Sequence, residues 1–171
     1  MKTLSLLALF LCGSVLVFAA DAKVSDPQIA AIVVTANQVD IDAGKVAAAK
    51  SVNAEVKKFA QTMVTDHTAV NKSAVDLVTK LKVAPEENAT SQALKAGGDK
   101  NLAALRGLEG QAFDRAYVAN EVTYHQQVID ALDTVLIPNA QNSELKALLV
   151  KVRPAFIAHL EHSKHLQSTL R

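Results

Sequence analysis

Three histidines carry the strongest chemical signal in this sequence. His67, His125 and His159 each stand in the middle of a row of apolar residues spaced alternately four and three apart, which is the spacing of one face of an α-helix. Residues on such a face are buried against other helices. A buried imidazole that lacks partners for its nitrogens costs about 1–3 kcal/mol. Three of them, in positions that leucine could fill, therefore need a reason.

Two carboxylates extend this set. Asp40 occupies the middle of a similar stripe in an earlier segment, and Glu121 lies one turn before His125. Imidazole and carboxylate groups at one level of a bundle core are typical ligands of a divalent metal ion, and zinc or copper suits them better than magnesium or calcium. The candidate ligands are therefore His67, His125, His159, Asp40 and Glu121. A second, equally good stripe would leave Asp40 at its edge: Ile32, Ala36, Val39, Ala43 and Val46.

Four further residues are candidates for an outer layer that orients these ligands: Asp66, Asp114, Tyr117 and His162. Asp66 is adjacent to His67, and Tyr117 lies one turn beyond Glu121. The run HLEHSKH, residues 159–165, is more typical of a solvated helix face than of a complete set of ligands.

A metal-free interpretation stays open. A hydrogen bond between His67 and Asp40, or between His125 and Glu121, would satisfy these groups within a structural polar layer. Residues in the middle of helices also lie at similar heights in any bundle, so a shared level is partly automatic.

Four long helical segments must position these residues: 27–49, 54–81, 111–136 and 143–170. Ser25 or Asp26 can cap the first, and Ser51 or Asn53 the second. Pro154 lies inside the last segment and is expected to kink it or break it near residue 151.

The connection between the second and third segments is long, polar and only weakly helical in pattern, and it contains Gly97 and Gly98. Laid along the bundle, it would make the second and third helices parallel. The expected fold is all-α, a ferritin-like up-down four-helix bundle with one long crossover. At about 1.5 Å rise per residue, Asp40 and the three histidines then fall within one turn of each other, about 5 Å.

Length and composition set further limits. Residues 1–22 resemble a secretory signal peptide, with Lys2, an apolar run and small residues at the end. We therefore expect an exported protein, periplasmic or otherwise extracytoplasmic, with a single domain over residues 23–171. Cys12, the only cysteine, would leave with the signal. The net charge of +1 offers no basic field to nucleic acid, and no transmembrane segment is expected after the signal.

Other chemistry finds no support. Gly97–Gly98 lacks the context of a phosphate loop, and no Gly-x-Ser-x-Gly elbow is present. Glu121 and His125 are four apart, not three as in the Glu-x-x-His pairs of di-iron bundles. A non-enzymatic, stress- or envelope-related binding protein is the leading hypothesis. The alternatives are a metal-dependent oxidoreductase on the same site and a purely structural or interaction bundle.

Three segments, FAQTMVTDHTAVN, FDRAYVANEVTYHQQVIDALD and LLVKVRPAFIAHLEHSKHL, follow the predicted signal in this order. Together they resemble the bacterial domain of unknown function 4142 (DUF4142) family over nearly all of the mature chain. The resemblance implies an exported ferritin-like helical bundle, often labelled a predicted outer-membrane protein, and no established activity.

The family pattern falls on eight positions: Asp66, His67, Phe113, Asp114, Tyr117, His125, Pro154 and His159. In the first helix the family tends to carry glutamate before Leu-Gly-Lys. Here the corresponding segment is VDIDAGK, with Asp40 and Asp42.

Overall fold

The computed structural model describes residues 23–170, and the predicted signal peptide lies outside them. The described part is helical and contains no strand, which confirms the all-α class. Its long helices are α1 (Asp26–Lys50), α2 (Ala54–Leu81), α3 (Ala89–Arg106), α4 (Gly110–Ala131) and α6 (Ser143–Thr169). Between α4 and α6 lie a π-helical segment, η1 (Leu132–Leu136), and the short α5 (Ile137–Asn139).

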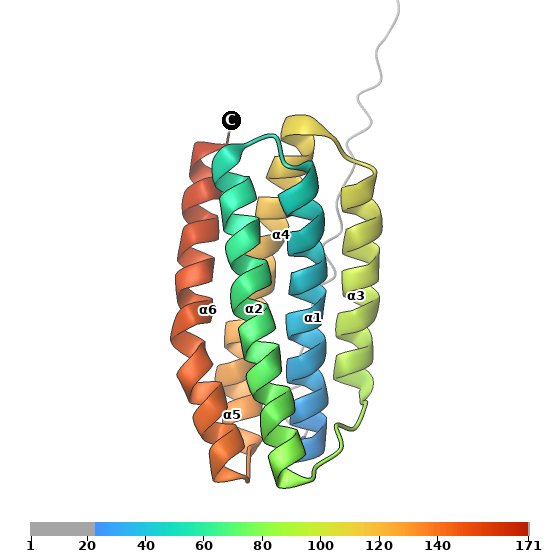
Figure 1. Cartoon of the computed structure of the whole chain (residues 1–171), viewed down its shortest axis with the longest axis vertical. Coiled ribbons are helices and arrows are strands. Elements are labelled where there is room, and N and C mark those ends of the chain that lie inside the picture. Colours follow the sequence, from blue (N-terminus) through green and yellow to red (C-terminus); the bar gives the residue numbers. More distant parts are fainter. Residues whose placement is uncertain (1–22, 171) are drawn as a thin grey trace, which may run out of the picture.

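The long helices lie side by side along one axis (Figure 1). In that view α1, α3 and α6 run upward, whereas α2 and α4 run downward. The chain therefore returns to the upper end through α3, and α2 and α4 are parallel, as the sequence predicts. The connection differs from the expectation in one respect: it is an 18-residue helix, not a polar loop with a weak helical pattern.

Local contacts explain why α3 forms. Asn88 caps its first turn by accepting backbone N–H groups of Thr90 and Ser91, and the Ser91 side chain accepts the Asn88 N–H in return. Leu94 and Leu105 bury the inner face. Gly98 allows close approach to α1, because a Cβ atom built there would lie 2.7 Å from a Val39 methyl.

Pro154 does not break α6, so of the two expected effects, a kink or a break near residue 151, the break is excluded. Buried side chains on both sides of the proline, Leu149 and Phe156, hold the helix against its neighbours. Arg153 adds a two-pronged ion pair to Asp133 of η1, with both N···O distances 2.6 Å. The predicted third helix, 111–136, is also modified, since its last five residues form the π-helical η1.

The core is divided into two apolar clusters. The upper cluster lies toward the α1–α2 turn and comprises Ala43, Ala47, Val56, Phe59, Ala60, Met63, Leu105, Phe113, Tyr117, Val118 and Leu166. The lower cluster lies toward the opposite end and comprises Ile29, Ile32, Val33, Ala74, Leu94, Ile129, Leu132, Val135, Leu136, Ala140, Leu145, Leu149, Phe156 and Leu160. The candidate ligands lie between the two clusters along the helices.

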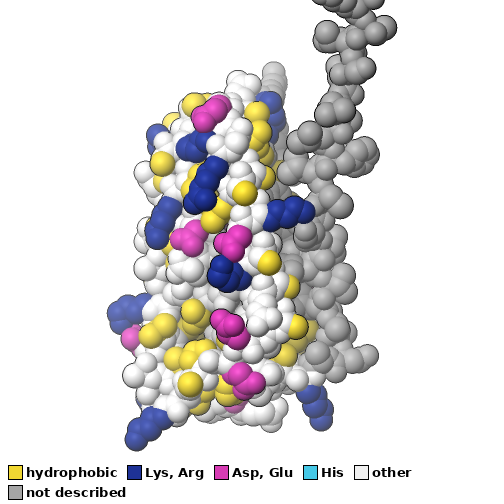
Figure 2. All heavy atoms as spheres, turned by 90° about the vertical axis from the view of Figure 1, so that its right-hand side faces the viewer, with side chains coloured by type: hydrophobic (Ala, Val, Ile, Leu, Met, Phe, Trp, Pro, Cys, Tyr) yellow, Lys and Arg dark blue, Asp and Glu magenta, His cyan; other side chains and the backbone are white. Residues whose placement is uncertain are grey.

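The surface on the α3 side carries interspersed basic and acidic side chains, and no histidine is visible on it (Figure 2). Such a mixed surface has no strong field of one sign. Among residues 23–170, none of the helices combines the length and the apolar character needed to cross a bilayer.

Candidate metal centre

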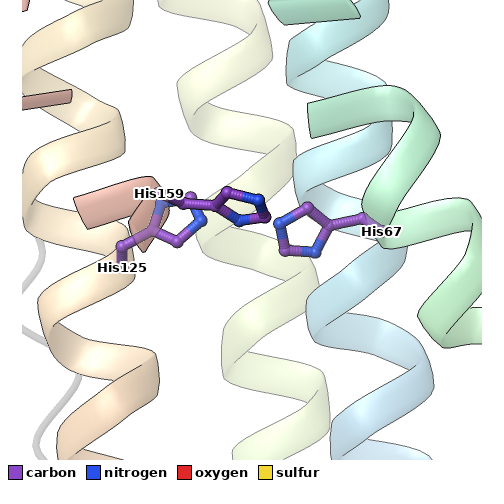
Figure 3. Close-up of side chains that lie close together, drawn as sticks. All are labelled: His67, His125 and His159. Atoms are coloured by element: carbon purple, nitrogen blue, oxygen red, sulfur yellow. The ribbon is translucent and has the colours of Figure 1, made fainter. Parts of the chain in front are cut away.

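Three imidazole rings meet in the interior of the bundle. His67 from α2, His125 from α4 and His159 from α6 point toward one another (Figure 3). Their ring centroids are separated by 5.5 Å (67–125), 5.4 Å (67–159) and 5.3 Å (125–159). None of the three is more than 6% exposed. One ligand nitrogen from each lies within 4.8 Å of the other two, so the 4–3 spacing correctly places them at one level.

Asp40 joins this group from α1. It is 1% exposed, so the face of α1 that carries Asp40 is the buried one. Its Oδ2 lies 3.0 Å from His67 Nε2 and 3.5 Å from His125 Nε2. Ligand atoms bound to zinc at 2.0–2.1 Å in a tetrahedral site lie about 3.3 Å apart. These two separations already bracket that value.

Glu121 forms a second group with Asp40 and His125, again with one ligand atom from each within 4.8 Å. It is 1% exposed, and its Oε2 lies 3.5 Å from His125 Nδ1. The five predicted ligands are thus brought together, and we call them the histidine layer: Asp40, His67, Glu121, His125 and His159.

Hydrogen bonds fix the orientation of His67. The Asn37 side-chain amide donates to the Val33 carbonyl at 2.8 Å, which turns its Oδ1 toward the ring. That oxygen lies 2.8 Å from His67 Nδ1, so Nδ1 carries the proton and donates. The other nitrogen, Nε2, is therefore an unprotonated acceptor in the neutral ring.

The other two rings are held in the same manner. His125 Nδ1 donates to the Glu121 backbone carbonyl at 3.0 Å, and His159 Nε2 donates to Asp66 Oδ2 at 2.9 Å. Each ring therefore gives one nitrogen to an acceptor and presents the other. Metal-ligating histidines usually have this arrangement, in which the outer acceptor sets the tautomer.

The presented nitrogens find no hydrogen bond. His67 Nε2, His125 Nε2, His159 Nδ1 and both Asp40 oxygens are buried without a partner. Buried polar atoms of native proteins are nearly always satisfied, so this concentration of acceptors calls for a cation, for protons or for an ordered water molecule. The metal-free interpretation relies on hydrogen bonds from His67 to Asp40 or from His125 to the Glu121 side chain. His67 holds its ring proton on Nδ1, toward Asn37, and not on the Nε2 that faces Asp40. His125 Nδ1 donates to the Glu121 backbone carbonyl, whereas the Glu121 side chain is 3.5 Å away. A proton on Asp40 Oδ2, shared with His67 Nε2 across 3.0 Å, would satisfy only that pair.

The interior favours the neutral form of each of these groups. Burial lowers the pKa of His67 to about 3, and burial outweighs the attraction of Asp40 to lower the pKa of His125 to about 4. Burial likewise raises the pKa of Asp40. Burial and the nearby Asp40 raise the pKa of Glu121 well above its usual range, against a smaller opposite effect of Asn120. Neutral imidazole is the form that binds metal, whereas the carboxyl groups must give up protons.

Two of the four predicted outer residues, Asp66 and Tyr117, lie near the histidine layer. The other two, Asp114 and His162, make their contacts elsewhere. Asp66 holds His159, as described. The Tyr117 hydroxyl is buried without a partner, and burial, with the charges of Glu121 and Asp40, raises its pKa well above the usual range. Asp114 instead accepts the Asn53 backbone N–H at 3.1 Å, at the start of α2. His162 is exposed and contacts the Phe59 ring edge-on, with 4.9 Å between centroids.

Two residues of the site are absent from the sequence prediction. Asn37 orients His67, and Phe156 stacks on the same ring at 5.2 Å with 13° between the planes. The position of Asn37 one turn after Val33 and one turn before Asp40 was a usable signal, since it places a polar amide on the buried face of α1. Phe156 could be read only as another apolar residue of its stripe.

A small cavity adjoins the histidine layer on the side of the lower cluster. Its volume is about 30 Å³, and His67, Asn37 and Phe156 form part of its wall. The remaining wall is mostly aliphatic.

The fold and the site define an all-helical protein with a buried group of histidines and carboxylates that can hold a metal ion. The chain belongs to the DUF4142 family, described as a domain of unknown function, whose model matches residues 15–166. No curated protein and no solved structure matches the chain.

Proposed function

We propose that the protein binds a divalent transition metal ion in the histidine layer. His67, His125 and His159 supply nitrogen ligands, Asp40 supplies an oxygen ligand, and Glu121 lies within reach as a second oxygen ligand. The observation that carries the proposal is the hydrogen bonding of the rings. Each ring has one nitrogen fixed by an outer acceptor and the other buried without a partner beside its neighbours.

The ligand set restricts the metal. Three imidazoles and a carboxylate suit zinc or copper, whereas magnesium and calcium prefer sites made of oxygen atoms alone. Methionine sulfur is a typical ligand of copper(I). Met63, the one methionine among the described residues, belongs to the upper cluster and not to the histidine layer. Zinc(II) is therefore the first ion to test, and copper(II) the second.

The proposal also includes an extracytoplasmic location for the protein and a relationship of its fold to ferritin-like bundles. The composition of residues 1–22 supports export, so the binding role would be exercised in the periplasm or bacterial envelope, in storage or stress protection. A ferritin-like relationship is supported by the parallel α2 and α4, by the crossover along the bundle, and by polar ligands inside it.

The test is a calorimetric titration of chelator-treated protein with zinc(II). We expect one ion to bind per chain, and we expect His67→Ala to abolish binding. His165→Ala is the matched control, because His165 is exposed on α6 and its loss leaves zinc affinity unchanged. His125→Gln, which keeps a polar group of similar reach, serves if His67→Ala fails to fold. Equal binding by all variants, or no binding by the wild type, contradicts the proposal.

A second candidate function is a metal-dependent oxidoreductase on the same site. The cavity beside His67 and Asn37 favours it, because a reactant can lie next to a ligand. The test loads the protein with copper(II) and follows its absorption through reduction by ascorbate and reoxidation in air. Reversible cycling that His125→Gln abolishes supports this function. If air does not reoxidise the bound copper, the oxidoreductase function is excluded and the metal-binding proposal is unaffected.

A further inference from the structure

Residues of six helices or segments line the cavity below the histidine layer. Ile32 of α1, Val70 of α2, Leu94 of α3, Val128 of α4, Leu132 of η1 and Phe156 of α6 all contribute to its wall. The wall is almost entirely apolar, and the volume is about 30 Å³.

The few polar groups in the wall are turned toward other protein groups, so the surface that faces the cavity is almost entirely apolar. Asn37 donates to Val33 and accepts from His67. The Tyr124 hydroxyl donates to the Ala36 carbonyl at 2.7 Å. The remaining nitrogen of His67, Nε2, faces Asp40. A buried water needs two to four polar partners, and apolar cavities of native proteins stay dry.

The size of the cavity limits what can enter. A single water-sized atom group requires roughly 10–15 Å³ by this measure, so about 30 Å³ holds two or three such spheres. That is the size of a diatomic molecule, and it is too small for an aromatic ring or a lipid chain.

Two features of the chain account for this cavity, a π-helical turn and two small side chains. The π-helical turn of η1 places Leu132 and Leu136 at the wall, and π-helical turns inside α-helices often mark functional sites. Ala36 and Ala131 also line the cavity, where a larger aliphatic residue would close it. A well-packed interior has few such voids.

We infer that this cavity binds a small apolar diatomic molecule with the size and polarity of dioxygen. The inference rests on the wall of the cavity and not on a bound metal, so it stands or falls separately from the proposed metal site.

The experiment uses methyl-labelled full-length protein under dissolved oxygen, with nitrogen as the reference gas. Because dioxygen is paramagnetic, methyl groups that contact it relax faster. We expect the largest oxygen-dependent relaxation at the wall, in Ile32 and Leu132. Val56 and Val118, equally buried in the upper cluster, are the reference methyls. Equal enhancement at both places, or nuclear Overhauser effects from water to the wall methyls, overturns the inference.

Filling the cavity provides the second arm. Ala131→Leu should remove the enhancement at Ile32, whereas Ala119→Leu, on the exposed face of α4, should preserve it. Val128→Ile, which adds one methylene, replaces Ala131→Leu if the latter fails to fold. An enhancement that persists in the filled variants also overturns the inference. Zinc titration of the same variants keeps the two proposals distinguishable, because failure to bind zinc leaves the oxygen result intact.

Discussion

The two apolar clusters on either side of the histidine layer are built differently. In the upper cluster, aromatic rings pack on one another: the Tyr117 ring lies 6.3 Å from Phe59 and 6.4 Å from Phe113. The lower cluster is largely aliphatic, includes the π-helical η1 and borders a cavity. The same helices therefore support the layer with close packing from above and leave room beside it from below.

A matched pair of enlargements tests this difference in packing. Ala60 is fully buried in the upper cluster and Ala131 is 2% exposed at the cavity wall. Ala60→Val should lower the free energy of unfolding by about 1–3 kcal/mol, because it overpacks a filled region. Ala131→Val should be nearly neutral, since it grows into existing space. Urea unfolding measures both, and equal losses would mean that the clusters are packed alike.

Replacing Asp66 tests the histidine layer without changing either apolar cluster. Asp66 holds His159 but belongs to neither cluster. Asp66→Asn should weaken zinc binding about 10- to 100-fold, as for other outer partners of metal-bound histidines, with little change in the stability of the metal-free protein. Asp76→Asn, in an exposed pair with Lys72 on α2, is the control. Indistinguishable zinc affinities of the two variants would remove Asp66 from the site.

The pH dependence of zinc binding tests the charge state of the layer. Because the pKa of Glu121 is raised, the metal-free protein holds a proton that a cation displaces, whereas His67 and His125, with pKa values of about 3 and 4, are already neutral. Zinc affinity should therefore rise with pH, by up to about tenfold per unit for each displaced proton, until the pH exceeds the raised pKa. Calorimetry in buffers of different ionisation enthalpy counts the protons. Glu121→Gln should release fewer, and equal release would show that Glu121 is ionised beforehand.

The smallest expected effect concerns α3, which contributes Leu105 to the upper cluster and Leu94 to the lower one. Gly97→Ala should raise the free energy of unfolding by about 0.5–1 kcal/mol through helix propensity, because a Cβ there has no neighbour within 4 Å. Gly98→Ala should lose that gain, since its Cβ meets the stiff Val39 side chain at 2.7 Å. Thermal unfolding compares them, and an equal gain would show that α3 does not lie tightly on α1.

Much of the fold and of the candidate site could be predicted from the sequence. Apolar spacing reports the buried face of a helix, so it located four helices and brought His67, His125 and His159 to one level. It did not predict α3 as a full helix, because the glycines lower local propensity and Gly98 is favoured only by the tertiary contact with Val39. It also could not show η1 or the cavity, which depend on how neighbouring helices pack. His162 was predicted beside the ligands from helix spacing and Asp114 from the family resemblance. A surface contact with Phe59 engages His162, and a contact with the backbone of Asn53 engages Asp114.

The most direct test of the metal site is thermal unfolding of the wild-type protein in chelator and in excess zinc(II), on material whose metal content has been measured after purification from its natural compartment. Zinc that binds only the folded protein should raise the free energy of unfolding by about 2.7 kcal/mol when its free concentration is a hundred times the dissociation constant. The melting temperature should rise accordingly. Identical melting curves in chelator and in zinc, from protein that carries no metal, would contradict the account.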